Sequence, residues 1–363
     1  MYGVCKRVKV VDLACVEYDT NRRLIIEGSF GMSRKKCRRS CGVGGQAVLE
    51  GVMMKNKDLY AVTVRKPNGE LVIDTEEFHG VMHGSKIKNV PFIRGIFNFV
   101  DSLILGTRTL TYSADFVEDE TAKETEFDRW MKKTFKDKAE SVVTGLTVTL
   151  SIVLAIGIFM VLPYFISSLL DTFVRNRTIL AIIEGIIRLA IFVGYVVLIS
   201  AMEDIKRVYM YHGAEHKCIN CIERGHELTV ENAMRSSRLH KRCGTSFMLF
   251  VMMVSIIMFM FISVENPVMR LVIRILLVPV IAGISYEIIR LAGNNSNNIL
   301  VRIISAPGMW LQTLTTKEPT EDMVEVAIKS VEAVYDWREY LKEEFGYGVD
   351  TEKEETETEV SPS

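Results

Sequence analysis

Long parts of this chain contain no charged residue, although charged residues make up 25% of the whole. Thirty consecutive residues from Ser141 to Leu170 are uncharged, and a second uncharged segment runs from Gly244 to Val264. A helix of roughly 20 apolar residues crosses the hydrocarbon core of a bilayer. A buried helix of a soluble protein seldom lacks charge over such a length. The two segments therefore predict membrane-spanning helices.

Three other features are also missing. The first thirty residues mix charges and lack a clean apolar core, so no secretory signal is visible there. The seven cysteines are an odd number, which predicts reduced thiols or metal ligands and not a disulfide framework. The glycine-rich segment from Gly42 to Val52 lacks the lysine and hydroxyl of a phosphate-binding loop. Its glycines instead indicate a turn or a close approach of the backbone.

Two further segments, 178–202 and 268–293, are apolar but contain ionisable residues, which brings the expected number of spans to four. Either these side chains reach the head groups from near the helix ends, or they line an internal cavity. We favour the first alternative because most of them lie near the ends of the expected helices. The residues are Glu184, Arg188, Arg270, Arg274, Glu287 and Arg290.

The basic residues predict how these helices are oriented. They are concentrated before the first span and between the second and third spans, whereas the loop 171–177 has only two arginines and the turn 265–267 has no base. By the positive-inside rule, the basic segments face the cytoplasm, and four spans place both termini there as well. The basic residues are Arg129, Lys132, Lys133, Lys136 and Lys138 in the first segment, and Lys206, Arg207, Lys217, Arg224, Arg235, Arg238 and Lys241 in the second.

The part of the chain before the first span predicts a small α+β unit. Residues 60–65 and 71–74 flank an Asn-Gly pair, which is typical of a β-hairpin. Residues 91–113 have apolar side chains near helical spacing, interrupted by charges, which predicts a helix that lies on the bilayer surface or on the body of the protein and does not cross the membrane. The basic run Arg34–Arg39 is interpreted as an interfacial anchor beside anionic head groups, so no nucleic-acid partner is expected.

Beyond the last span we expect a loop at 293–298 and then one amphipathic helix. Thr320 is its expected N-cap, and Glu321 and Asp322 supply acids for the first turn. Apolar and small residues recur at three- and four-residue spacing, which predicts packing on the body of the protein or on a partner. They are Met323, Val326, Ser330, Val334, Trp337 and Leu341.

These expectations give a mainly α, polytopic membrane protein with about four transmembrane helices and a small α+β N-terminal part. Its segments are a basic, cysteine-containing leader (1–41), a cytosolic α+β and interfacial region (42–140), a first helix pair (141–202), a cytosolic loop rich in histidine, cysteine and acids (203–246), a second helix pair (247–293), a C-terminal cytosolic region (294–346) and an acidic disordered tail (347–363).

The sequence YHGAEHK at 211–217 contains the pattern H-x-x-E-H. On a helix, His212 and His216 lie four residues apart on one face and can share a metal ion. Glu215 is rotated by about 100° from His216 and lies beside the ligands. Inverted zinc hydrolases use this arrangement, with the glutamate activating a metal-bound water. Asp204 lies about two turns earlier on roughly the same face, where it could ligate the metal or orient a histidine.

Two histidines need further ligands to complete a metal site. His240 and Cys243 lie just before the third span and complete a ligand set that zinc accepts. His226 is a further nearby histidine. Lys217 and Arg242 would add positive charge for an anionic substrate such as a phosphate.

Several features nearby have simpler interpretations. Cys218 and Cys221 form a single C-x-x-C, which is more typical of plain reduced thiols than of ligands when no second pair accompanies it. His79 and His83 are also four residues apart, but their turn-rich surroundings favour surface side chains. Gly213 weakens a helix and counts against the metal hypothesis.

The chain resembles the YqhQ-like family of bacterial membrane proteins, described as metal-dependent enzymes of unknown function. The resemblance covers roughly residues 42–335 and implies the four-span layout of a bacterial plasma-membrane protein. It implies a site formed by His212, Glu215, His216, His240 and Cys243. The chain departs from the family form at Lys241, where the family has proline. The motifs are GGQAVLEGVMM at 44–54, YHGAEHK at 211–217, RCGTSF at 242–247 and PGMWLQTLTTKEP at 307–319.

Two functional hypotheses follow. The first is a membrane-embedded zinc hydrolase that acts at the cytosolic face on a lipid-linked or membrane-associated substrate. Glu215 would be the general base of this enzyme. Its partners would be the bilayer and that substrate, and the hypothesis also allows a second copy of the chain. The second hypothesis is a transporter or assembly scaffold, in which the histidine and cysteine cluster is structural and the charged residues of the spans line a path or a helix interface.

Overall fold

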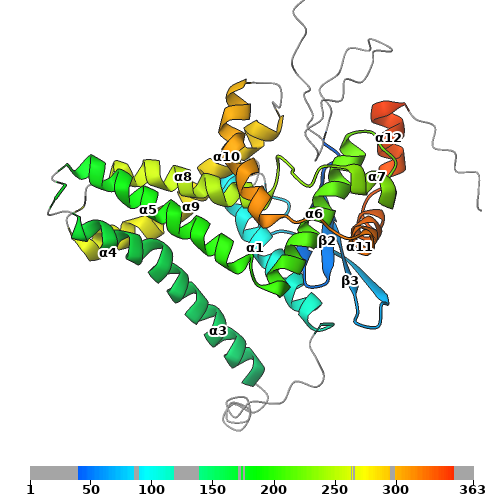
Figure 1. The fold of residues 1–363 in the computed structure, drawn as a ribbon, viewed down its shortest axis with the longest axis horizontal. Coiled ribbons are helices and arrows are strands. Elements are labelled where there is room, and N and C mark those ends of the chain that lie inside the picture. Colours follow the sequence, from blue (N-terminus) through cyan, green and yellow to red (C-terminus); the bar gives the residue numbers. More distant parts are fainter. Residues whose placement is uncertain are drawn as a thin grey trace, which may run out of the picture.

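A computed structural model describes residues 40–85, 90–117, 139–170, 173–174, 176–262, 264, 266–294 and 299–346, and the structural statements below concern these residues. The fold is mainly helical, with one antiparallel sheet near its N-terminal end. Long helices extend to one side in Figure 1, and the sheet lies with shorter helices on the other side. The leader and the acidic tail expected from the sequence lie outside the described residues.

The sheet is a meander of four strands in the order β1-β2-β3-β4. The strands are β1 (Val43–Val48), β2 (Gly51–Asn56), β3 (Leu59–Arg65) and β4 (Leu71–Glu77). The expected hairpin is confirmed, because β3 and β4 pair in register from Arg65 opposite Leu71. The glycine-rich segment forms a second hairpin that was not predicted. A Cβ at Gly51 would collide with the backbone carbonyl of Thr63, so the expected close approach is to the neighbouring strand.

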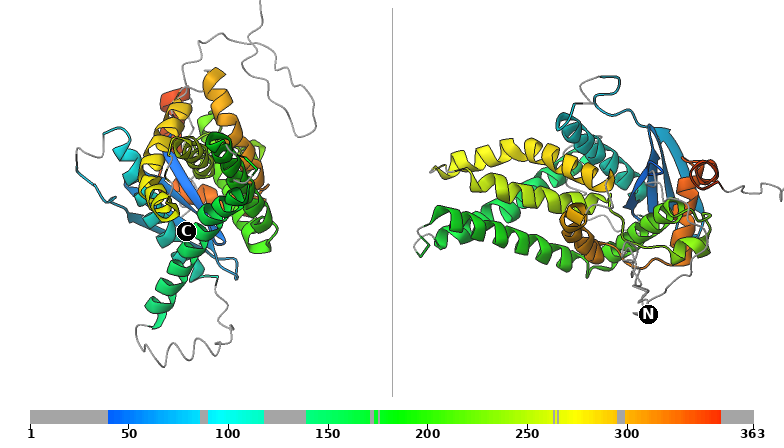
Figure 2. Two further views of the ribbon diagram at one scale, coloured as in Figure 1. Left: turned by 90° about the vertical axis from the view of Figure 1, so that its left-hand side faces the viewer. Right: turned by 90° about the horizontal axis from the view of Figure 1, so that it is seen from above.

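Among the residues that the structure describes, three helices are long and apolar enough to cross a membrane. They span Gly145–Leu169, Ile179–Ile199 and Val268–Leu291. The first is continuous through α3 (Ala139–Ile156), a π-helical turn (Gly157–Val161) and α4 (Leu162–Leu169); the others lie in α5 (Arg177–Ile199) and α9 (Pro267–Asn294). The remaining predicted span, 244–264, forms α8 (Gly244–Met260), which is apolar but has only 17 residues. Helix α3 projects away from the other helices in Figures 1 and 2.

Helix α1 (Ile93–Ala114) connects the two parts of the fold. Gly95 lets it approach α9 so closely that a Cβ would lie 2.7 Å from Tyr286 Cβ, and Gln46 Nε2 of β1 donates to the carbonyl of Gly106 at 3.4 Å. The helix packs on the body of the protein through these contacts and exposes apolar side chains on another flank. These are Val100, Leu103, Ile104 and Leu110.

The region after the last span contains three helices instead of one. Helix α10 (Ile299–Thr315) was not predicted, and α11 (Glu321–Glu332) begins where expected, although the side chain of Thr320 makes no capping hydrogen bond. The expected long helix ends at Glu332, and a separate helix, α12 (Trp337–Phe345), follows it. Asp336 caps α12, because its carboxylate accepts from the N–H groups of Arg338 and Glu339. All six residues of the predicted stripe are buried.

The main core lies between the sheet, α11 and α6 (Glu203–Glu223). Met54 of β2, Tyr211 and Ile219 of α6, and Met323 of α11 are among its fully buried side chains. This packing holds α6 rigidly against the sheet. Figure 2 shows α6 beside the sheet, at the end of the long helices.

Three charged side chains of the long helices are buried inside the bundle. Glu184, Arg188 and Arg274 are each at most 6% exposed. They do not extend from the helix ends toward the surface, so the favoured interpretation of these three was wrong. The physical reason is that the carboxylate lies between the two guanidinium groups and neutralises part of their charge.

Candidate metal centre

The H-x-x-E-H pattern lies on one continuous helix, α6. The helix starts after Met202, which is extended, and has Glu203 and Asp204 in its first turn, where acids favour the positive helix end. Gly213 fits here for a tertiary reason, because a Cβ would collide with the carbonyl of Lys317, whose N–H donates to the Tyr209 carbonyl at 2.9 Å. The glycine that weakens the helix locally therefore admits the chain that follows α10.

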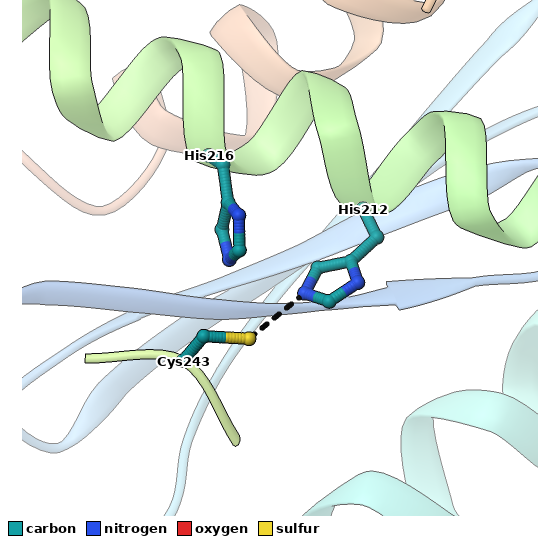
Figure 3. A group of neighbouring side chains, drawn as sticks. All are labelled: His212, His216 and Cys243. Carbon is teal, nitrogen blue, oxygen red and sulfur yellow. Dashed lines mark hydrogen bonds between the residues drawn. The ribbon is translucent and has the colours of Figure 1, made fainter. Parts of the chain in front are cut away.

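His212 and His216 project from α6 toward Cys243, which lies just before α8 (Figure 3). One ligand atom from each of the three residues lies within 4.8 Å of the other two. His212 Nε2 is 3.2 Å from Cys243 Sγ. Ligand atoms around tetrahedral zinc lie about 3.3–3.6 Å apart, given bonds of about 2.0–2.3 Å. Small side-chain rotations therefore suffice for the three atoms to share one ion.

Backbone carbonyls fix the orientation of both imidazoles. His212 Nδ1 is 2.9 Å from the carbonyl of Thr315, and His216 Nδ1 is 2.7 Å from that of Arg238. A carbonyl only accepts, so each Nδ1 carries the proton and each Nε2 presents a lone pair. Burial also lowers the pKa of His216, which favours the neutral, ligating form. Second partners of this kind are typical of metal-ligating histidines.

Cys243 is the N-cap residue of α8, and its sulfur makes two polar contacts with Thr245. The backbone N–H of Thr245 is 3.4 Å from Sγ, and Thr245 Oγ1 is 2.7 Å from it. These contacts hold the sulfur in place at the start of α8. Thr245 was missed from sequence, although it lies within the RCGTSF motif and two residues after the cysteine.

Glu215 is buried beside the two histidines on α6. Burial raises its pKa to about 7, against the opposing effects of His212 and of a hydrogen bond from the backbone of Gly45. A Cβ at Gly45 would lie 3.0 Å from Glu215 Cγ and 2.6 Å from the Met53 carbonyl. Gly45 of β1 thus allows the sheet to cover Glu215, and it is a site residue that sequence reasoning assigned only to close approach.

His240 does not join the cluster. Its Nε2 is 3.4 Å from Glu223 Oε2, and its backbone exchanges hydrogen bonds with the side chain of Gln312 at 2.9 and 2.7 Å. Its ring centroid is 5.7 Å from that of His216. Of the two residues expected to complete the ligand set, the structure brings Cys243 to the two histidines and not His240, because the Glu223 carboxylate holds the His240 ring.

The three residues expected to support the site have other surroundings. Asp204 is exposed at the start of α6. Lys217 is buried and donates to the carbonyls of Met234 and Ser236 at 2.7 and 2.9 Å, besides pairing with Glu318 at 2.7 Å. Arg242 forms a close ion pair with Glu223. Lys217 and Arg242 are thus occupied by structural contacts and not directed at a free anion.

The remaining cysteine and histidine candidates differ from the cluster. Cys218 and Cys221 are free, and burial raises the pKa of Cys221 to about 11 and that of Cys218 well above its ordinary value. Both are therefore held as neutral thiols, which agrees with their interpretation as plain reduced cysteines. His79 and His83 lie on the surface beside Asp58 and form a second, exposed group of ligating side chains.

These features define a class of protein: apolar helices compatible with a membrane, attached to a sheet-and-helix unit that contains a His/His/Cys cluster, of which His216 and Cys243 are buried. The chain belongs to the family described as "Protein of unknown function (DUF1385)", which matches residues 90–337. It is 36% identical over 299 residues to "Uncharacterized protein YqhQ" of Bacillus subtilis (strain 168), covering 79% of this chain and 90% of that protein. No solved structure matches the chain. These matches confirm the resemblance to the YqhQ-like family that the sequence motifs indicated.

Proposed function

We propose that this protein is a metal-dependent enzyme, a zinc hydrolase that acts at the cytosolic face of a bacterial plasma membrane. The observation that carries the proposal is the convergence of His212 Nε2, His216 Nε2 and Cys243 Sγ, with both imidazoles oriented by backbone carbonyls. A cluster that only filled space would not need one buried and one partly buried imidazole with their Nε2 atoms directed at a thiol. Two nitrogens and one sulfur are ligands that zinc prefers, and three protein ligands leave one position for catalysis.

Each residue of the site has a defined part in this proposal. His212, His216 and Cys243 would hold the metal, which when bound supplies Lewis-acid activation of water at neutral pH. Glu215 would accept the proton from the attacking water and return it to the leaving group, because a carboxyl group with a pKa of about 7 can do both near neutral pH. The Thr315 and Arg238 carbonyls keep the imidazoles in place while the charge changes.

The location of the cluster supports a membrane-associated substrate. Cys243 directly precedes the apolar helix α8, and α6 begins four residues after α5 ends. The cluster therefore lies at the N-terminal end of the apolar helix α8, because both histidines of α6 face Cys243. We propose four spans with both termini in the cytoplasm, α8 being the short one, because the basic residues of 203–241 then face the cytosol.

The competing hypothesis is a transporter or scaffold without catalysis. Its support is the buried group of Glu184, Arg188 and Arg274, which lies in the long helices away from the metal cluster. The two hypotheses differ in which substitutions abolish function. Glu215→Gln abolishes function in an enzyme, whereas Glu184→Gln or Arg274→Ala is the crippling change in a transporter.

The test is elemental analysis of the full chain purified gently in detergent. We expect about one tightly bound metal ion per chain, which is lost in His216→Ala and in Cys243→Ser. The matched controls are His226→Ala, at an exposed side chain, and Cys221→Ser, and both should retain the metal. Glu215→Gln should keep the metal and lose function in vivo. Purified protein without metal, or metal content unchanged by Cys243→Ser, would refute the proposal.

A further inference from the structure

A second polar cluster lies inside the helix bundle, apart from the metal centre. Glu184 and Arg188 of α5 are one helical turn apart, and Arg188 Nη2 donates to Glu184 Oε1 at 2.9 Å. Arg274 of α9 donates to both oxygens of the same carboxylate, at 2.6 and 3.0 Å. The three side chains therefore form one unit that ties α5 to α9.

The charges of this cluster do not balance. Two guanidinium groups share one carboxylate, so the group carries one net positive charge in a segment where uncompensated charge is costly. Phe259 of α8 lies within 5.1 Å of both guanidinium carbons, and its ring face partly compensates them. A cation–π contact at one shared ring supplies less stabilisation than a second anion would.

Arg188 is the guanidinium group that makes a single hydrogen bond to the carboxylate and has a donor unpaired within the described part of the chain. Arg188 is 5% exposed, and its Nε is a buried donor without a hydrogen-bond partner among the residues that the structure describes. Arg274, in contrast, uses two of its nitrogens on the carboxylate. A buried donor left unpaired is destabilising, and more so when the group is charged. Arg188 thus has both a charge and a donor that an additional anion would satisfy.

We propose that the Glu184–Arg188–Arg274 cluster binds one tetrahedral oxyanion of the phosphate class, with Arg188 as the residue that recognises it. Guanidinium groups bind phosphate oxygens through paired N–H donors. The flanks of both helices expose apolar side chains, among them Ile186 and Leu276, which acyl chains can cover. The phosphate can therefore come from the head group of an anionic lipid or from solution. Nothing in this site depends on the metal centre.

The experiment measures thermal unfolding of the full chain in neutral detergent micelles. Phosphatidylglycerol, phosphatidylcholine or inorganic phosphate is titrated into separate samples. We expect a saturable rise in the unfolding temperature with phosphatidylglycerol and none with phosphatidylcholine. A rise with inorganic phosphate as well would identify free phosphate as a sufficient ligand. A chain that shows no saturable response to either anion does not have the site.

Substitutions distinguish a binding residue from a structural one. Arg188→Met leaves Glu184 and Arg274 as a neutral pair, so without ligand its stability should equal or exceed that of the wild type. Its affinity for the anion should fall by about tenfold or more, as expected for lost charged hydrogen bonds. Arg290→Met removes the same charge from an exposed position on α9 and should bind normally.

Arg188→Lys provides a second test that keeps the fold intact. Lysine retains the charge and the contact with Glu184 but lacks the Nε donor and the planar fork. We expect a measurable loss of affinity that is smaller than that of Arg188→Met. Equal affinity in the wild type and in both Arg188 variants would overturn the assignment, as would an equal loss in Arg290→Met.

Discussion

Substituting Gly213 by alanine tests whether the metal centre depends on the close contact between α6 and the segment that follows α10. On an isolated helix, Gly213→Ala would stabilise by up to about 1 kcal/mol. In the fold, the added Cβ would lie against the carbonyl of Lys317, well inside the 3.0 Å that real Cβ atoms essentially never approach. The backbone of Lys317 is held beside α6, because its N–H donates to the Tyr209 carbonyl at 2.9 Å.

The magnitude follows from the size of the clash. Backbone must move by about 1 Å, and such overpacking costs typically about 1–3 kcal/mol, which exceeds the gain in helix propensity. Thr315, whose carbonyl orients His212, lies only two residues from Lys317. A displaced partner of a ligating histidine typically lowers metal affinity by about 10- to 100-fold. We therefore expect lower stability and weaker metal binding together.

The assay is thermal unfolding in detergent combined with metal content after dialysis against a mild chelator. Gly194→Ala is the matched control, because it also lies inside a helix and a Cβ there meets nothing within 4 Å. We expect Gly213→Ala to unfold several degrees below both the wild type and the control. If the two alanine variants behaved alike in unfolding temperature and in metal content, the argued contact with Lys317 would not exist.

Two further predictions concern the unit around the sheet. The pKa of Glu223 is lowered to about 2, because the hydrogen bond from His240 and the charge of Arg242 outweigh its desolvation. Its stabilising contribution should therefore be full above the ordinary carboxyl pKa near 4.5 and be lost as the pH falls toward 2, and Glu223→Gln should reduce this acid dependence in unfolding experiments. Ser330 is fully buried, and its hydroxyl lies 3.1 Å from carbonyls of both β2 and β3. Ser330→Ala should lower the free energy of unfolding by about 1–3 kcal/mol, and an unchanged unfolding midpoint would contradict that role.

Features encoded in short segments could be predicted from the sequence. The Asn68-Gly69 pair identified the β3–β4 hairpin, because those residues favour the tight turn that two alternating strands need. The apolar segments identified the long helices, because length and lack of charge are local properties. The spacing of His212 and His216 placed both on one helical face, because the helical period fixes side-chain direction.

Helix α10 could not be predicted in the same way. Its sequence contains Pro307 and Gly308, which ordinarily interrupt a helix. The structure retains the helix because it packs on α8, with Gly308 so close to Ser246 that a Cβ would lie 2.9 Å from its side chain. Tertiary packing here overrides local preference, and no local pattern reports the neighbour that makes it favourable.

The sequence by itself determined the chemical inventory of this protein: apolar helices, an H-x-x-E-H helix and a nearby cysteine. Only the tertiary structure decided which residues meet. It directed Cys243 and not His240 toward the two histidines, since Glu223 holds the His240 ring. It buried Glu184, Arg188 and Arg274 together instead of at the surface. The reason is that local periodicity fixes the direction of a side chain on its own element, whereas its partners come from elements distant in the sequence.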